Sequence, residues 1–259
     1  MKIGLFGKQL APNFKPALDT LINCLIEKQA KIWIHPQFNP YFNQNYQQEI
    51  EKSSAFMHST SIPADLDYLI TIDPHLHRYH SLSEIYSIPA QALHATDIIG
   101  HYLKQQVSNP LVIGPDEESE QWAKNVAQIA GCDYLVLRKT RSGDRDVAIH
   151  IPDVQIYADH QPVLVDDIIS TGRTMLRTAD ELVAQGLNKP LCIGVHAVFA
   201  EGGPGVPSAD EEMRAGPIAG IVTCNCIPHV TNGIDISPLL VPAIQAMLHA
   251  QSASSGDTL

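Results

Sequence analysis

Residues 162–175 read PVLVDDIISTGRTM, and this stretch decides the fold class. Its four apolar residues predict a buried strand over 162–167, which ends in two adjacent carboxylates, Asp166 and Asp167. A short loop then opens a predicted helix over 174–185, and Gly186 closes that helix at its C-terminus. A strand that feeds a helix in this way is the unit of a parallel sheet covered by helices.

The same alternation on both sides of this stretch predicts an α/β fold with a Rossmann-like parallel sheet. Apolar strands at 1–6 and 31–36 frame a helix over 14–27, which gives a β-α-β start. Residues 37–63 have no strong period and are predicted as loop with one helix near 46–55. The other predicted strands are 67–72, 111–114, 134–139, 191–199 and 220–225, and the other predicted helices are 92–106, 117–130 and 239–251.

Composition narrows the class of protein. The chain has 259 residues and a formal net charge of −11, and 44% of its residues are hydrophobic. These values predict a folded globular protein and argue against a basic face for nucleic acid. The five cysteines are scattered, which predicts reduced thiols. We find no signal peptide and no apolar run of about 20 residues, so we expect a cytoplasmic protein without membrane contact.

The loop at 170–174 has the residue types of a phosphate-binding cradle. Ser170, Thr171, Gly172, Arg173 and Thr174 bring backbone N–H groups and hydroxyls to a helix N-terminus, where the potential is positive. The two preceding carboxylates can accept ribose hydroxyls, directly or through a hydrated Mg²⁺. A Walker-type loop is absent. The alternative interpretation is an ordinary capped helix start, since the same residue types are favoured there.

Three further segments carry candidate functional residues. Asp73 and His75 follow the predicted strand 67–72, and Asp116 follows the strand 111–114, so these residues can bind a nucleotide-associated Mg²⁺ or its waters. Lys139 and Arg141 open a charged, mobile loop that suits charge neutralisation in phosphoryl transfer, although a solvated basic loop looks the same.

Two zinc interpretations have weaker support. The histidines at 75, 77 and 80 and the pair Cys224-x-Cys226 each lack a partner pair at the spacing of a structural zinc site. We expect both cysteines to be packing residues on a strand.

The loop at 166–174 resembles the 5-phosphoribosyl-1-diphosphate (PRPP) binding loop of type I phosphoribosyltransferases and ribose-phosphate diphosphokinases. DPHLHRY at 73–79 and GPDEESEQW at 114–122 resemble segments of ribose-phosphate diphosphokinase, also called PRPP synthetase, in its archaeal-type branch. The resemblance covers roughly 71–249 and implies a type I phosphoribosyltransferase-like domain. It also implies transfer of the β,γ-diphosphate of ATP to the C1 hydroxyl of ribose 5-phosphate, which gives PRPP and AMP.

The resemblance assigns a role to each candidate residue. The 5-phosphate and ribose of ribose 5-phosphate would lie on the residues of the loop and its two preceding carboxylates, Asp166, Asp167, Ser170, Thr171, Gly172, Arg173 and Thr174. Asp73, His75 and Asp116 would organise Mg²⁺ and ATP. Lys139 and Arg141 would neutralise the transferring diphosphate. Members of the family assemble as dimers or hexamers, so a homo-oligomer is implied.

The first 72 residues look different from the rest. They resemble the β-α-β start of a bacterial NAD kinase, without the glycine-rich loop of that family. The N-terminal ATP motifs of PRPP synthetases are not found either, which predicts impaired ATP use. We therefore predict an N-terminal α/β region at 1–72, a PRPP synthetase-like region at 73–249 and a disordered tail at 250–259.

Two other functions stay open on the sequence. One is a phosphoribosyltransferase that consumes PRPP, which shares the 166–174 loop but leaves the Asp73 and Asp116 segments unexplained. The other is a non-catalytic homologue, natural fusion or chimera that binds ribose 5-phosphate or PRPP without turnover.

Overall fold

The computed structural model describes residues 2–5, 31–34, 56–58, 68–76, 79–116, 119–141, 147–150 and 154–254. The chain divides into two compact units. Unit 1 is made of three segments, 1–94, 225–228 and 235–259, and unit 2 is made of 95–224 and 229–234. The helices predicted at 14–27 and 46–55 lie outside the described residues.

Unit 2 contains a six-stranded sheet in the order β13-β12-β11-β10-β6-β7, and every pair of neighbours is parallel. From β6 the chain moves to β7 at one edge, and it then returns to β10 on the other side of β6. The strand order therefore reverses between β6 and β10, and ligands of such sheets bind outside the carboxyl ends of the strands at this reversal. The strands are β6 (Pro110–Gly114), β7 (Asp133–Val136), β10 (Gln161–Ile169), β11 (Leu191–Ala197), β12 (Gly220–Cys224) and β13 (Asn232–Ile234).

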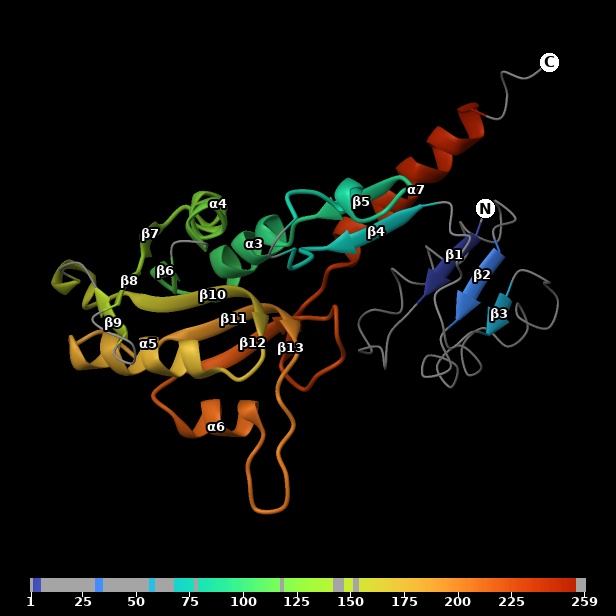
Figure 1. The fold of residues 1–259 in the computed structure, drawn as a ribbon. Coiled ribbons are helices and arrows are strands. Elements are labelled where there is room, and N and C mark those ends of the chain that lie inside the picture. Colours follow the sequence, from blue (N-terminus) through green and yellow to red (C-terminus); the bar gives the residue numbers. More distant parts are fainter. Residues whose placement is uncertain are drawn as a thin grey trace. The chain divides into compact units, whose positions relative to one another are not determined.

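Helices cover both faces of this sheet (Figure 1). α3 (Thr96–Gln106) and α4 (Glu120–Ala130) pack together on one face, and α5 (Arg173–Ala184) and α6 (Ala209–Ala215) lie on the other. Each helix forms because its apolar residues recur on one side. In α5, for example, Met175, Ala179 and Leu182 are buried, and the charged residues between them are exposed.

The core of unit 2 lies on the central strands. Strands buried on both faces need continuous apolar runs, and β6 and β10 have them, with Leu111, Ile113 and Leu164 fully buried. Cys192 of β11 belongs to the same core, and burial raises the pKa of its thiol to about 12. This cysteine is therefore a packing residue and is not poised to react.

Unit 1 has two small groups of strands. β1 (Lys2–Leu5), β2 (Lys31–Ile34) and β3 (Phe56–His58) form a parallel three-stranded sheet. β4 (Leu69–Ile72) and β5 (Ala90–Leu93) form a parallel pair, and α7 (Ser237–Ser254) contacts β4. Among the described residues, no helix combines the length and apolar character that crossing a bilayer requires.

The structure differs from the sequence predictions at several short elements. The segment predicted as a helix over 92–106 begins as β5, and helix α3 starts only at Thr96. The strand predicted over 134–139 is divided into β7 and β8 (Arg138–Arg141), and β8 pairs antiparallel with β9 (Val147–His150). Strands of three to five residues are too short to show a clear period, so apolar patterns do not separate them from helix ends.

At the C-terminal end, Cys226 lies in a turn after β12 and not on the strand with Cys224. Helix α7 continues through Ser254, so the first five residues of the segment predicted to be a disordered tail, 250–254, are helical. The elements that the sequence did not indicate are β3, β5, β9, α6 and β13.

Candidate functional site

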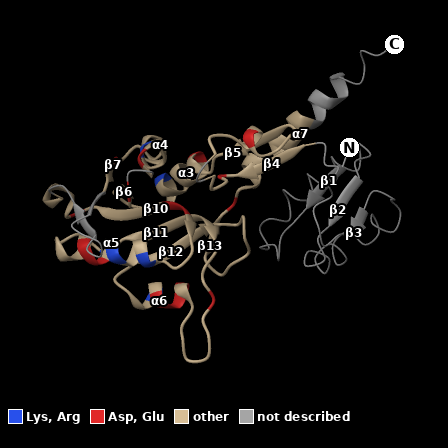
Figure 2. Ribbon diagram, viewed as in Figure 1, with Lys and Arg blue, Asp and Glu red and all other residues tan. Residues whose placement is uncertain are grey.

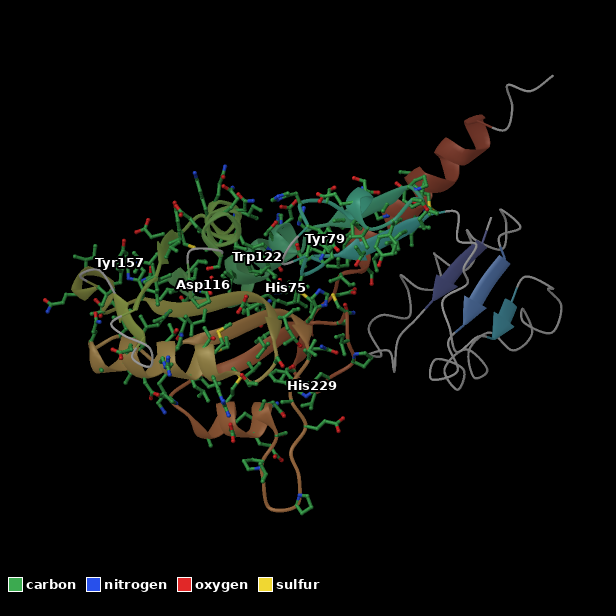
Figure 3. The ribbon with its side chains drawn as sticks, viewed as in Figure 1. His75, Tyr79, Asp116, Trp122, Tyr157 and His229 are labelled. Carbon is green, nitrogen blue, oxygen red and sulfur yellow. The ribbon has the colours of Figure 1, made fainter. Side chains whose placement is uncertain are left out.

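The predicted acidic residues of unit 2 meet at the reversal of strand order. Asp166 lies near the carboxyl end of β10, opposite Gly194 of β11, and Asp116 follows the neighbouring strand β6 (Figure 3). The turn at Asp116 is held by Ser119, whose Oγ donates to the Asp116 carbonyl over 2.6 Å and whose N–H donates to Oδ1 over 3.3 Å. Sheet topology therefore brings together carboxylates that are 50 residues apart in sequence.

The electrostatics of these carboxylates suit a cation or a hydroxyl donor. Burial, with the nearby charges of Asp167 and Asp116, raises the pKa of Asp166 to about 7. The Asp167 N–H donates to Asp166 Oδ1 over 3.0 Å, which offsets only part of this effect. Crowded carboxylates disfavour their joint ionised form, and a bound cation relieves that repulsion.

The loop after β10 has the geometry of an anion cradle. Gly172 has φ +67°, in the left-handed region, and helix α5 begins at the next residue. The first N–H with a helical partner belongs to Leu176, which donates to the Gly172 carbonyl over 2.9 Å. Within the described part of the chain, the N–H groups of 171–175 donate no hydrogen bond, and neither do the hydroxyls of Ser170, Thr171 and Thr174. These donors converge where an anion binds best.

Arg173 strengthens the positive potential of this cradle. It is exposed at the first position of α5, and Arg177 follows one turn later; both are in the first half of the helix, which carries the basic residues in Figure 2. A cation at a helix N-terminus is unfavourable on its own, because the helix dipole is positive there. When an anion is bound, the charge of Arg173 and the positive end of the helix dipole both attract it, so both stabilise the complex.

Helix α6 supports the cradle from beneath. A Cβ atom on Gly172 would overlap Sδ of Met213, a fully buried residue of α6. Two backbone hydrogen bonds make a second link, since Ala200 N–H donates to the Ser170 carbonyl over 3.1 Å and Ala209 N–H donates to the Ala200 carbonyl over 3.0 Å. Sequence analysis did not predict this support, because α6 is too short to show helical periodicity.

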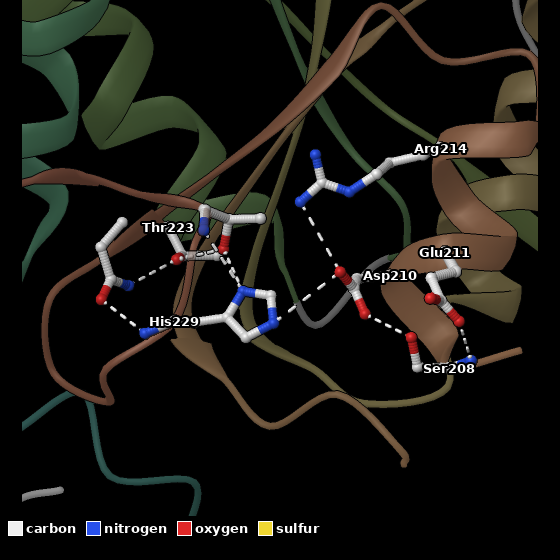
Figure 4. A network of polar contacts seen from close by, with 8 residues as sticks. Ser208, Asp210, Glu211, Arg214, Thr223 and His229 are labelled. Carbon is white, nitrogen blue, oxygen red and sulfur yellow. Dashed lines mark hydrogen bonds and ion pairs between the residues drawn. The ribbon is translucent and has the colours of Figure 1, made fainter. Parts of the chain in front are cut away.

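A polar network fixes the N-terminus of α6 (Figure 4). Ser208 N–H donates to Glu211 Oε2 over 2.8 Å, and Ser208 Oγ donates to Asp210 Oδ1 over 2.7 Å. Asp210 Oδ2 lies 3.6 Å from an Arg214 nitrogen and 3.8 Å from His229 Nε2. Burial works to raise the pKa of Asp210, but the Ser208 bond and the charges of His229 and Arg214 outweigh it and lower that pKa.

His229 is itself oriented by the turn between β12 and β13. The Thr231 N–H donates to His229 Nδ1 over 3.3 Å, and the two side chains, Thr231 Oγ1 and His229 Nδ1, are 2.8 Å apart. Because Nδ1 accepts from the backbone, the proton of a neutral His229 ring lies on Nε2, which faces Asp210. The ring also packs on Phe199, with centroids 4.7 Å apart. The β12–β13 turn therefore steadies α6 and, through Met213, the cradle.

Two of the predicted metal-binding residues lie in unit 1. Asp73 is buried directly after β4 and has φ +32°, an unusual value for a residue other than glycine. His75 is exposed two residues later. His94 Nδ1 lies 2.8 Å from Asp73 Oδ1. Sequence analysis missed His94, because the residue was included in the predicted helix 92–106.

The structure brings only part of the predicted site together. Asp116, Asp166, Asp167 and the cradle belong to unit 2, whereas Asp73 and His75 belong to unit 1, so their union in one site stays a prediction. Lys139 and Arg141, expected at the opening of a loop, occupy strand β8, in register with Ile149 and Val147. Among the described residues, no group of three or more His, Cys, Asp or Glu side chains has the arrangement of a metal site.

The chain is similar in sequence to a known domain family and to several curated proteins. Residues 81–219 match the phosphoribosyl transferase domain family. Ribose-phosphate pyrophosphokinase from Thermococcus kodakarensis is 30% identical over 209 residues, which cover 78% of this chain and 70% of the relative. The same enzyme from Methanopyrus kandleri is 29% identical over 187 residues, covering 71% of this chain. The match spans 61% of the Methanopyrus protein, less than two thirds of its length.

The similarity extends further toward the N-terminus than the sequence motifs indicated. Residues 71–259 make up about 73% of the 259-residue chain. The match to ribose-phosphate pyrophosphokinase from Aquifex aeolicus, at 26% identity, covers 83% of the chain, and the Thermococcus match covers 78%. Both matches therefore include part of the first 70 residues, where we had found no family motif.

The fold has a solved counterpart. The crystal structure of phosphoribosylpyrophosphate synthetase from Mycobacterium smegmatis matches with a TM-score of 0.58 at 18% identity, and the match covers 89% of this chain and 78% of that one. The predicted α/β, Rossmann-like class is confirmed. The chain carries a phosphoribosyl transferase domain and belongs to the ribose-phosphate pyrophosphokinase family.

Proposed function

We propose that this protein transfers the β,γ-diphosphate of ATP to the C1 hydroxyl of ribose 5-phosphate, which gives PRPP and AMP. The observation that carries the proposal is the cradle of 170–174, with its unpaired N–H groups, next to Asp166 and Asp167 at the reversal of strand order. The relatives named ribose-phosphate pyrophosphokinase add support.

Ribose 5-phosphate has one anionic end and several hydroxyls, and the site offers a partner for each. The N–H groups and hydroxyls of the cradle bind the 5-phosphate, with Arg173 as an added cation. Asp166 and Asp167 accept hydrogen bonds from the ribose hydroxyls. This orientation places the C1 hydroxyl for attack on the β-phosphorus of ATP, and positioning of this kind supplies much of the rate acceleration in phosphoryl transfer.

The donor residues also fit Mg²⁺ as the cofactor of ATP. Mg²⁺ prefers oxygen ligands and keeps several waters, so one or two carboxylates suffice to hold it. Burial and the nearby charges of Asp167 and Asp116 raise the pKa of Asp166, and a bound cation stabilises the ionised form of carboxylates placed in this way. When bound, Mg²⁺ neutralises charge on the triphosphate. We assign the binding of Mg²⁺ and ATP to Asp116, Asp73 and His75.

Lys139 and Arg141 complete the proposal as the cations that stabilise the transferring diphosphate. The β8–β9 hairpin that carries them follows β7 in the chain, and β7 lies beside β6 in the sheet. We extend the proposal to a homo-oligomer, dimer or hexamer, acting in the cytoplasm, as the family resemblance implies.

The test is production of AMP and PRPP from ATP, ribose 5-phosphate and Mg²⁺, with calorimetric titration of each substrate. We expect equimolar AMP and PRPP. Binding of ribose 5-phosphate without turnover would refute the enzymatic proposal in favour of a binding homologue. Formation of a nucleotide from PRPP and a free base, without PRPP synthesis, would instead indicate a phosphoribosyltransferase that consumes PRPP.

A further inference from the structure

His94 and Asp73 occupy matched positions at the ends of two neighbouring strands. β4 and β5 pair in parallel from Leu69↔Ala90 to Ile72↔Leu93, and Asp73 and His94 are the next residue on each strand. The Asp73 N–H continues the ladder by donating to the Leu93 carbonyl over 2.9 Å. The imidazole of His94 then reaches Asp73 Oδ1 over 2.8 Å. Leu93, the last residue of β5, therefore binds the backbone of Asp73, and His94, which follows it, binds the side chain.

The Asp73 carboxylate is buried, so the direction in which it points depends on its hydrogen bonds. Its side chain is only 6% exposed, and a buried charge is costly unless it is hydrogen-bonded. The carboxylate also acts on a neighbouring group. Burial of the Cys226 thiol, with a smaller contribution from the charge of Asp73, raises the pKa of that thiol to about 12. The backbone of Asp73 is also in the left-handed region, which surrounding contacts must stabilise.

The side chain of His94 makes few other contacts that would stabilise the fold. Its side chain is 67% exposed, and in the described part of the chain its ring makes no hydrogen bond apart from the one to Asp73. An exposed side chain of this kind adds little to a hydrophobic core, and the polar contact that His94 makes is the one with Asp73.

We propose that His94 is a positioning residue for the ATP–Mg²⁺ side of the site: its Nδ1–H holds Oδ1 of Asp73 and so fixes the direction in which the carboxylate faces its ligand. The inference rests on the proposed function, in which Asp73 contacts Mg²⁺ or its waters. Groups that orient a ligating carboxylate in this way affect metal affinity by about 10- to 100-fold.

The test compares His94→Ala, His94→Asn and His94→Gln by calorimetric titration with MgATP and by steady-state kinetics. We expect His94→Ala to weaken MgATP binding about tenfold or more and to raise its KM equally. The KM for ribose 5-phosphate and the Tm should stay within the error of wild type. His94→Asn should recover most of the affinity, because the Asn amide nitrogen can occupy the place of Nδ1, whereas His94→Gln extends further and should recover less.

His101→Ala is the matched control. His101 is also exposed, and its Nδ1 also makes one hydrogen bond, but to the Asp97 carbonyl within helix α3. This variant should bind MgATP as wild type does. The inference is overturned if His94→Ala leaves MgATP affinity unchanged, or if it lowers the Tm and weakens both substrates alike, which indicates a general structural role.

The calorimetric measurement of MgATP binding distinguishes failure of this inference from failure of the proposed function. If wild type binds MgATP but makes no PRPP, the proposed function fails, and the calorimetric comparison still decides the role of His94. If wild type binds no MgATP, the inference is refuted directly.

Discussion

Gly172→Ala tests the cradle, because the substitution perturbs its backbone and its support together. An L-residue in the left-handed region costs about 1–2 kcal/mol, and Gly172 has φ +67°. The new Cβ would also overlap Sδ of Met213, and overpacking of this kind costs about 1–3 kcal/mol. If the loop leaves its conformation to relieve about 2 kcal/mol of this strain, affinity for ribose 5-phosphate falls about 30-fold.

Gly131→Ala separates the two costs. Gly131 ends α4 with φ +73°, and a Cβ there meets no atom within 4 Å. Its substitution should therefore lower the free energy of unfolding by the backbone strain alone, about 1–2 kcal/mol, and leave ribose 5-phosphate affinity unchanged. In the Gly172→Ala background, Met213→Ala removes the overlapping side chain and should restore part of the lost affinity.

Calorimetric titration with ribose 5-phosphate and thermal unfolding measure these quantities in wild type, the three single variants and the double variant. Met213→Ala alone should destabilise the protein by about 2–5 kcal/mol, since a buried methionine leaves a cavity. The reasoning is refuted if Gly172→Ala binds ribose 5-phosphate as tightly as wild type does. Equal affinity of Gly172→Ala and the double variant would refute the role of Met213 specifically.

The other predictions concern the charged residues. Asp167→Ala should weaken ribose 5-phosphate binding about tenfold or more, because a hydrogen bond to a charged group is lost; unchanged affinity by calorimetry would contradict its role. Lys139→Ala should lower kcat about 100-fold or more, with little change in ribose 5-phosphate affinity; the reverse pattern would remove Lys139 from the transfer step. The pKa of Asp166 is raised to about 7 in the folded protein, so the folded state binds this proton more tightly than the unfolded chain does. Asp166 therefore contributes stability at low pH that is lost as the pH rises from about 4 to about 7. Asp166→Asn should remove this loss, and parallel curves of unfolding free energy against pH for the two proteins would argue against it.

The stretch 162–175 predicted the strand, the loop and the helix that form the cradle in unit 2. Its strand and helix are β10 and α5, and Asp166, Asp167 and the cradle are adjacent in sequence, so local pattern sufficed to place them together. Asp116 was predicted to follow a strand, and the structure places that strand, β6, beside β10, so both carboxylates lie at the same edge of the sheet.

The support of the site could not be predicted in the same way. Met213 reaches Gly172 from 41 residues away, on a seven-residue helix that is stabilised by a network from the β12–β13 turn. His94 was missed because the four residues of β5 carry no clear period and merge with the start of α3. In both cases a tertiary contact decides the role of the residue, and a single sequence does not show tertiary contacts.

The division of unit 1 into separate segments affects the order in which the chain folds during synthesis. Domains generally fold as units while the ribosome is still adding residues. All strands of the unit 2 sheet have been synthesised once residue 234 is complete. Strand β4 is made much earlier, but α7, which contacts it, is the last helix to emerge. The contact between β4 and α7 can therefore form only after every strand of the unit 2 sheet has been synthesised.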